Sequence, residues 1–138
     1  MNSLDSVRVN VEVPETVHAG KLVPITLRLQ NISDQPVDVY LKGRPVAFDI
    51  TVAREGREVV WRRLEGTTMS MVLQIRRLAP GEVVELTDTW NQQTNAGEPV
   101  SPGRYTIQGV LLTEAPQPLV TSPTTLRIVP QSLREEQR

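Results

Sequence analysis

Apolar and polar residues alternate along most of this chain with a period of two. The alternation is strictest in residues 7–13 and 23–29, where valine, isoleucine or leucine stands at every second position. Successive side chains of a β-strand point to opposite faces, so this period predicts strands that bury one face. The same alternation or a short apolar run recurs at residues 37–41, 48–52, 59–61, 69–75, 84–90, 105–111 and 126–128.

Clusters of proline, glycine and polar residues separate the predicted strands. Proline presets φ and glycine is free to take positive φ, so such clusters mark turns and loops. Pro80, Gly81 and Gly103 are expected to be structural residues of these turns. The predicted turns are residues 31–36, 54–57 and 78–82, and the longer loops are residues 91–103 and 113–123.

Eight or nine short strands with turns at this spacing predict an all-β fold, an immunoglobulin-like antiparallel β-sandwich. A strand with one apolar face must bury that face against a second sheet. The alternation is equally compatible with a closed β-barrel. The chain has 138 residues and no internal repeat, so we expect one domain over residues 1–130 and a charged tail at 131–138.

The composition excludes several classes of function. The chain has no cysteine, which rules out disulfides, iron–sulfur clusters, thiolate zinc sites and cysteine nucleophiles. Lys and Arg number 15 and Asp and Glu 16, and the resulting net charge of −1 argues against binding of nucleic acid or an anionic membrane. We expect no metal site and no cofactor. Without a basic start and apolar run at the N-terminus, a cytoplasmic location is expected.

No catalytic residue is expected, so the sequence predicts a protein that is not an enzyme. The single histidine, His18, lies in the predicted loop 14–21, where an exposed histidine is favoured over a general base oriented by Glu15. Asp88 interrupts the apolar face of residues 84–90. We interpret Asp88 as a structural aspartate, re-aimed by a β-bulge or placed at the sandwich edge, in preference to a catalytic acid.

The aromatic residues are expected to build the scaffold. Trp61 and Trp90 share the period of their apolar neighbours, which favours the core over a sugar-stacking platform. Tyr105 follows a Pro-Gly turn and is expected to act as a corner tyrosine, whose hydroxyl fixes the loop backbone.

Two motifs have a functional and a structural interpretation. The arginine pairs 62–63 and 76–77 either meet on neighbouring strands as a basic docking patch or lie in separate solvated stretches. The triplet 31–33, Asn-Ile-Ser, matches a glycosylation acceptor, but a turn closed by an Asx hydrogen bond is favoured.

The two long loops are the candidate binding elements. A rigid sandwich presents such loops to a partner, and their prolines limit the entropy lost on association. The expected partner is a protein, and the sequence makes no prediction of oligomeric state. The candidate contact residues are Pro99, Val100, Pro102, Arg104, Pro118 and Leu119.

Several motifs occur in a distinctive order between Leu22 and Leu112. They are Leu27-x-Leu29-x-Asn31, Pro36-Val37, Phe48-Asp49-Ile50-x-Val52, Gly56-x-Glu58-Val59-x-Trp61, Leu78-x-Pro80-Gly81-Glu82, Trp90, and Gly97-x-Pro99-Val100-x-Pro102-Gly103-x-Tyr105-Thr106. In this order they resemble the BsuPI-type intracellular proteinase inhibitor domain of bacteria. The segment 41–47 departs from that pattern, because no aromatic residue precedes Phe48.

The resemblance implies an immunoglobulin-like β-sandwich that inhibits an intracellular serine protease of the subtilisin type. It implies no cofactor and supplies no reactive-site residue for a position in this chain. The alternative function is a non-inhibitory interaction module, which binds a protein through an exposed sheet edge or the arginine patch.

Overall fold

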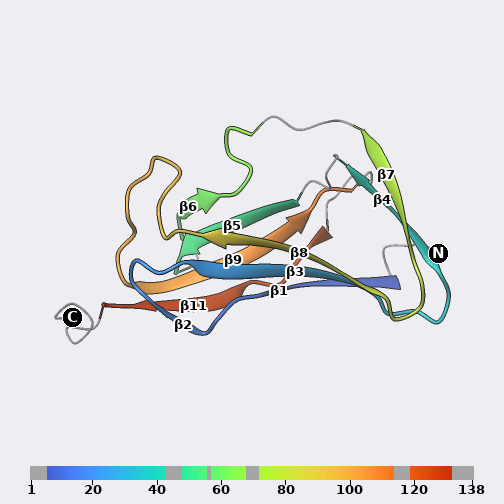
Figure 1. Cartoon of the computed structure of the whole chain (residues 1–138), viewed down its shortest axis with the longest axis horizontal. Coiled ribbons are helices and arrows are strands. Elements are labelled where there is room, and N and C mark those ends of the chain that lie inside the picture. Colours follow the sequence, from blue (N-terminus) through green and yellow to red (C-terminus); the bar gives the residue numbers. More distant parts are fainter. Residues whose placement is uncertain (1–5, 43–47, 56, 68–71, 114–118, 132–138) are drawn as a thin grey trace.

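The computed structural model describes residues 6–42, 48–55, 57–67, 72–113 and 119–131 (Figure 1). These residues form strands joined by turns, with no helix among them, and so with none that could cross a membrane. The strands are β1 (Val7–Glu12), β2 (Thr16–His18), β3 (Val23–Asn31), β4 (Val37–Lys42), β5 (Phe48–Arg54), β6 (Val59–Arg62), β7 (Leu73–Leu78), β8 (Val83–Trp90), β9 (Gly103–Leu111), β10 (Leu119–Val120) and β11 (Thr124–Val129).

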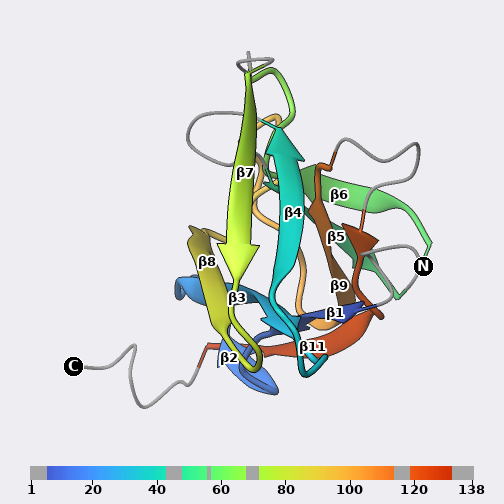
Figure 2. The same ribbon diagram turned by 90° about the vertical axis from the view of Figure 1, so that its right-hand side faces the viewer.

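Two sheets form the sandwich, and a third stands at one end of it (Figures 1 and 2). The first sheet has the order β1-β3-β8, and the second has the order β2-β11-β9-β5-β6, with β10 added to β9. The third is a ribbon of β4 and β7. The predicted immunoglobulin-like sandwich is therefore confirmed, and the described strands do not close into a barrel.

Two short strands lie where the sequence predicted loops. They are β2, within the predicted loop 14–21, and β10, within the predicted loop 113–123. The short strand β2 pairs with β11 in parallel, whereas the other strand pairs described are antiparallel. Pro14 precedes β2 and has no N–H for a sheet ladder, so the first strand ends there and the chain crosses to the second sheet.

The alternation of β3 is reproduced in three dimensions. Ile25, Leu27 and Leu29 are at most 2% exposed, while Thr26, Arg28 and Gln30 between them are partly exposed on the outer face. The opposite wall comes from β5, β9 and β11. Its fully buried residues include Ile50, Val52, Tyr105, Ile107, Leu111, Leu126 and Ile128.

Gly109 on β9 lies against the side chain of Leu27 on β3. A Cβ atom at this position would lie 2.6 Å from Cδ1 of Leu27 and 3.3 Å from Cγ2 of Thr121. No side chain larger than hydrogen fits there unless Leu27 moves. Gly109 thus sets the spacing of β3 and β9 in the middle of the sandwich.

Asn31, at the end of β3, links two turns that are distant in sequence. Its buried side chain donates from Nδ2 to the carbonyl oxygens of Gln35 (2.8 Å) and Leu78 (3.0 Å). Its Oδ1 accepts the N–H of Ser33 at 2.9 Å, which is the expected Asx hydrogen bond. The link to Leu78 adds the turn between β7 and β8 to the same network. Asn31 is therefore a structural residue.

Candidate functional site

Residues 91–103, which we call the hairpin loop, form an ordered hairpin at one end of the sandwich (Figure 1). Gln93 and Pro99 form an antiparallel bridge. Within it, Thr94 donates its N–H to the carbonyl of Glu98 at 2.7 Å, and Gly97 donates to the carbonyl of Thr94 at 2.9 Å. The Thr94 hydroxyl accepts the N–H groups of Ala96 and Glu98, both at 3.2 Å. The tip therefore has a fixed shape before any partner arrives.

Gln92 anchors the base of the hairpin loop to the turn after β2. Its side chain is 3% exposed and donates from Nε2 to the carbonyl oxygens of His18 (2.9 Å) and Lys21 (2.8 Å). The Gln92 carbonyl accepts the N–H of Val100 at 2.9 Å. Gln92 also adopts a positive φ of 62°, which is uncommon for a residue other than glycine. The sequence analysis missed this residue, because its partners lie more than 70 positions away.

Asn95 ties the tip of the hairpin loop to strand β6. Its Oδ1 accepts the N–H of Arg62 at 2.8 Å, and its Nδ2 donates to the carbonyl of Arg62 at 2.9 Å. The side-chain amide thereby pairs with β6 as a neighbouring strand would. Because β6 is the last strand of its sheet, Asn95 also covers part of that sheet edge.

Aromatic side chains connect the hairpin loop to the core. Trp90 is fully buried, and its ring centroid lies 6.1 Å from that of Trp61 and 5.9 Å from that of Tyr105. Trp90 donates from Nε1 to the carbonyl of Gln93 at 2.9 Å. The Tyr105 hydroxyl donates to the carbonyl of Ser101, four residues upstream, as in a tyrosine corner. Both sides of the hairpin loop are thus bonded to core residues.

Tyr105 makes the stability of the fold sensitive to alkaline pH. Burial raises the pKa of Tyr105 above its ordinary 10.0, although the charge of Arg54 offsets part of the shift. The native state therefore holds this proton more tightly than the unfolded chain does. Its stabilising effect is complete below about pH 10 and is lost as the pH rises toward the native pKa.

We expect Tyr105→Phe to lower the free energy of unfolding by about 1 kcal/mol at about pH 8, through loss of the hydrogen bond to Ser101. The difference from the unsubstituted chain should shrink at about pH 11, because only the tyrosine protein loses the contribution of the Tyr105 proton. Urea unfolding of both proteins at the two pH values measures this. An unchanged difference would contradict the role assigned to the hydroxyl.

Asp88 lies at the open edge of the sandwich, as one of the two sequence interpretations held. The pairing of β8 with β3 runs without a break through Asp88, so no bulge is present there. Its Oδ2 accepts from Nε of Arg63 at 2.6 Å, and Arg63 also donates to the carbonyl of Phe48 at 2.8 Å. The guanidinium stands 3.8 Å from the centre of the Phe48 ring. Asp88 and Arg63 therefore join the edges of the two sheets.

The two arginine pairs do not form one basic patch, so that interpretation is wrong. Strand β6 pairs with β5, whereas β7 pairs with β4 in a different sheet. Both residues of the second pair lie near carboxylates: Arg76 is 3.7 Å from Glu82, and Arg77 is 3.6 Å from Asp38. Together with the Arg63–Asp88 pair, these contacts disperse the positive charge.

The structure separates the predicted contact residues into two groups. Pro99 and Pro102 are exposed in the hairpin loop, Arg104 is exposed directly after it, and Val100 is half-buried against the core. Leu119 is half-buried on β10, opposite Leu111 at the far end of β9. Pro118 lies outside the described residues. The nine residues of β9 span about 30 Å, so the two loops do not share a surface.

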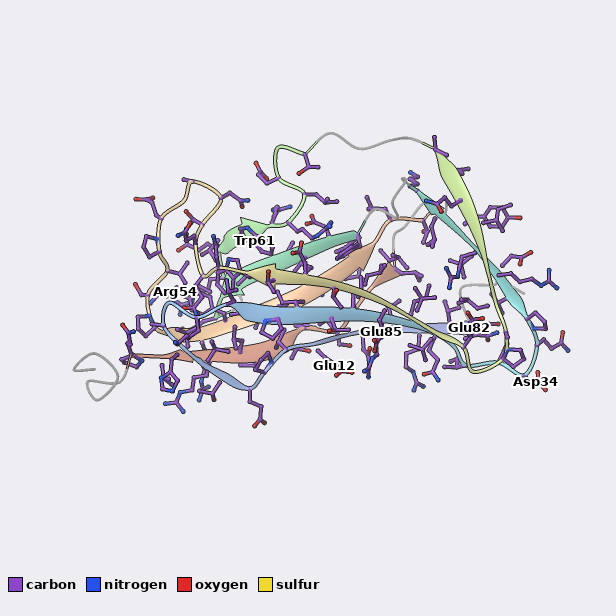
Figure 3. All side chains as sticks on the ribbon, in the orientation of Figure 1. Glu12, Asp34, Arg54, Trp61, Glu82 and Glu85 are labelled. Atoms are coloured by element: carbon purple, nitrogen blue, oxygen red, sulfur yellow. The ribbon has the colours of Figure 1, made fainter. Side chains whose placement is uncertain are left out.

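A second hairpin, between β5 and β6, lies beside the hairpin loop. The N–H of Glu55 donates to the carbonyl of Arg104 at 3.0 Å, which fixes this turn against the start of β9. Arg54, Arg57 and Glu58 are exposed around it. Figure 3 shows Arg54 and Trp61 at this end of the molecule, with Asp34 and Glu82 at the other. The end that carries the hairpin loop is thus charged around an uncharged tip turn, Asn95 to Gly97.

The single histidine lies near this end of the molecule. His18 is exposed, and its Nδ1 lies 3.4 Å from the carbonyl of Pro130. Among the described residues, no three histidine, aspartate or glutamate side chains are placed to hold a metal ion.

Comparison with known families identifies a match over most of the chain. The family model BsuPI, described as intracellular proteinase inhibitor, matches residues 8–116. The match is wider than the resemblance at residues 22–112, because it includes most of β1. The matched residues include the hairpin loop and the hairpin between β5 and β6. No curated protein matches the chain in sequence.

Comparison with solved structures supports the fold alone. A β-glucosidase from Erythrobacter marinus is 13% identical, with a TM-score of 0.50 over 90% of this chain and 15% of that enzyme. A β-glucosidase from Listeria innocua is 12% identical, with a TM-score of 0.47 over 91% of this chain and 16% of that enzyme. A CARDB domain from Pyrococcus furiosus is 15% identical, with a TM-score of 0.45 over 91% and 94% of the two chains. This chain therefore spans about one sixth of either glucosidase.

Proposed function

This chain belongs to the BsuPI family of intracellular proteinase inhibitors, and from that premise we propose that it inhibits a cytoplasmic serine protease of the subtilisin type. The hairpin loop is the element that we propose to contact the protease. It would occlude the substrate cleft without any chemistry or cofactor of its own. The single observation that carries this assignment is the internal order of the loop, which is bonded to both sheets and to the aromatic core.

Pre-ordering favours tight binding because little conformational entropy remains to be lost on association. Thr94 fixes the tip, and Gln92, Asn95 and Tyr105 fix its base and flanks. Each of these bonds forms within the free inhibitor. We therefore expect binding to proceed without refolding of the loop, and dissociation to be slow.

The bonding also argues against insertion of the loop as a substrate-like strand. A substrate pairs its backbone with the protease, but the N–H groups of Gly97, Glu98 and Val100 are already donated within the loop. Val100 is also packed against the core. We propose instead that the tip enters the cleft as a folded turn, with Pro99, Pro102 and Arg104 at its margin.

The test is titration of a subtilisin-type protease with the purified chain. The expected result is loss of activity in proportion to added inhibitor, ending near one chain per enzyme molecule. No loss of activity across several such proteases would refute the proposal and leave the non-inhibitory interaction module as the better assignment.

A matched pair of substitutions tests the location of the contact. Ala96 is exposed at the tip of the hairpin loop, and Ala79 is exposed in the turn between β7 and β8 at the opposite end. We expect Ala96→Trp to raise the inhibition constant at least ~10-fold, because the larger side chain would clash in a shaped cleft, and Ala79→Trp to leave it nearly unchanged. The reverse result would place the contact at the Ala79 end.

A further inference from the structure

The outer face of the β4–β7 ribbon has a regular arrangement of apolar and charged residues. In the register of the ribbon, Tyr40 stands opposite Ile75, and on either side of this pair stand Asp38 opposite Arg77 and Lys42 opposite Leu73. On β4 the alternate residues Val37, Val39 and Leu41 are buried in the core. Figure 2 looks onto the ribbon from outside the sandwich.

The centre of this face is apolar and open to solvent. Ile75 is 62% exposed, Leu73 43% and Tyr40 42%. These three are neighbours across or along the ribbon, whereas most other exposed apolar residues that the structure describes are scattered singly. Contiguous exposed apolar side chains that are rimmed by charges mark interaction surfaces.

We propose that this face binds a second copy of the chain. The two ribbons would stack face to face about a two-fold axis that lies between them and runs across the strands. Each β4 then lies over the β4 of the other copy in the opposite direction. Ile75 meets the Ile75 of the other copy, and the two Tyr40 rings lie side by side.

Charge complementarity supports a second copy as the occupant. The two-fold axis exchanges the ends of the ribbon, so Asp38 of each copy lies over Lys42 of the other. Lys42 has no ion pair with another described residue. In this arrangement each Lys42 pairs with the Asp38 of the other copy, so the dimer contains two such ion pairs. Arg77 lies over Leu73, where its aliphatic stem covers apolar surface. Such a self-complementary patch is what an isologous dimer requires.

The size of the ribbon sets the strength of the association. Two strands of six residues cover about 20 Å by about 10 Å, so the ribbon face alone would bury about 400 Å² in total, well below the ~1,200 Å² at which stable specific interfaces begin. The dimer is therefore expected to be reversible and to dissociate at micromolar concentrations. This inference does not depend on the protease, because the ribbon lies at the end opposite the hairpin loop (Figure 1).

Sedimentation of the full chain over a range from ~1 µM to ~500 µM tests the proposal. The expected result is a mass that rises from one chain toward two. Ile75→Lys should hold the protein monomeric across the range. Val83→Lys is the matched control, since Val83 is 43% exposed on β8 and lies outside the ribbon, and it should dimerise normally. A monomeric unsubstituted chain, or equal behaviour of the two variants, would overturn the proposal.

A charge exchange tests the orientation of the two copies. Lys42→Glu places a carboxylate over Asp38 of the other copy and is expected to weaken the dimer about 5-fold. The double variant Asp38→Lys with Lys42→Glu should regain most of that loss. A dimer that Ile75→Lys disrupts but that does not respond to Lys42→Glu would overturn the antiparallel stacking.

Discussion

Trp90→Ala is expected to lower the free energy of unfolding by about 4 kcal/mol, the largest effect of any single substitution considered for this chain. Trp90 is fully buried at the end of β8, between the rings of Trp61 and Tyr105. Removal of the indole leaves a cavity that three β-strands cannot close without distorting their pairing. It also leaves the carbonyl of Gln93 without its donor.

Trp90→Phe separates the two contributions. The phenyl ring retains most of the packing but cannot donate to Gln93, so we expect a loss of about 1–2 kcal/mol. Urea unfolding followed by far-ultraviolet circular dichroism measures both variants. The fluorescence of Trp61, which both variants retain, is an independent probe of the same transition. If Trp90→Ala cost no more than Trp90→Phe, the indole would not be the packing element described above.

Trp90 also offers a test of the proposed inhibition. Because its Nε1 holds the Gln93 carbonyl, Trp90→Phe should loosen the hairpin loop while leaving the protein folded at room temperature. We expect this variant to release a bound protease about 10-fold faster, with little change in its association rate. Surface plasmon resonance measures the two rates separately. An unchanged dissociation rate would show that the Trp90–Gln93 bond does not help to order the loop.

Asn31→Ala is expected to lower the free energy of unfolding by about 3 kcal/mol. The substitution removes the donor to the carbonyls of Gln35 and Leu78 and the acceptor for the N–H of Ser33. Gln35 and Ser33 are in one turn and Leu78 is in another; the bond to Leu78 is buried, and the bonds to Gln35 and Ser33 are partly buried. The two turns at this end of the β4–β7 ribbon, where Val37 pairs with Leu78, therefore lose their common support.

Asn10→Ala is the matched control, because Asn10 is an exposed asparagine on β1 and should change stability by less than about 0.5 kcal/mol. Urea midpoints at neutral pH compare the two variants. A cost for Asn31→Ala no greater than that of the control would mean that water replaces the lost bonds.

The strands and their inward faces could be predicted because they depend on local information. Ile25, Leu27 and Leu29 recur with the period of a β-strand, and the structure buries all three. The pairing of the strands has no such local signal. Residues 37–41 and 69–75 were predicted as strands, but no pattern in either stretch says that β4 and β7 pair with each other as a ribbon.

The order of the hairpin loop was beyond prediction for a related reason. Residues 91–103 appear in the sequence as a polar loop with prolines, and its length and exposure were foreseen. The bonds that fix it join Gln92 to His18 and Lys21, and Asn95 to Arg62, across 33 to 74 residues. Polar side chains of this kind are ordinary loop residues until the fold brings their partners within reach. The same holds for Arg63 and Asp88, which meet only after the two sheets pack.

The length of β9 has a consequence for stoichiometry. The hairpin loop ends at the first residue of β9, and the last residue of β9 lies near β4. The proposed protease-binding loop and the proposed dimer face of the β4–β7 ribbon are therefore at opposite ends of the molecule. If both proposals hold, a pair of inhibitors leaves both tips free and can hold two protease molecules about one long axis. Self-association would then leave the number of protease molecules bound per chain unchanged. The equivalence point of a titration stays at one chain per enzyme, whereas the mass of the complex doubles as the concentration rises.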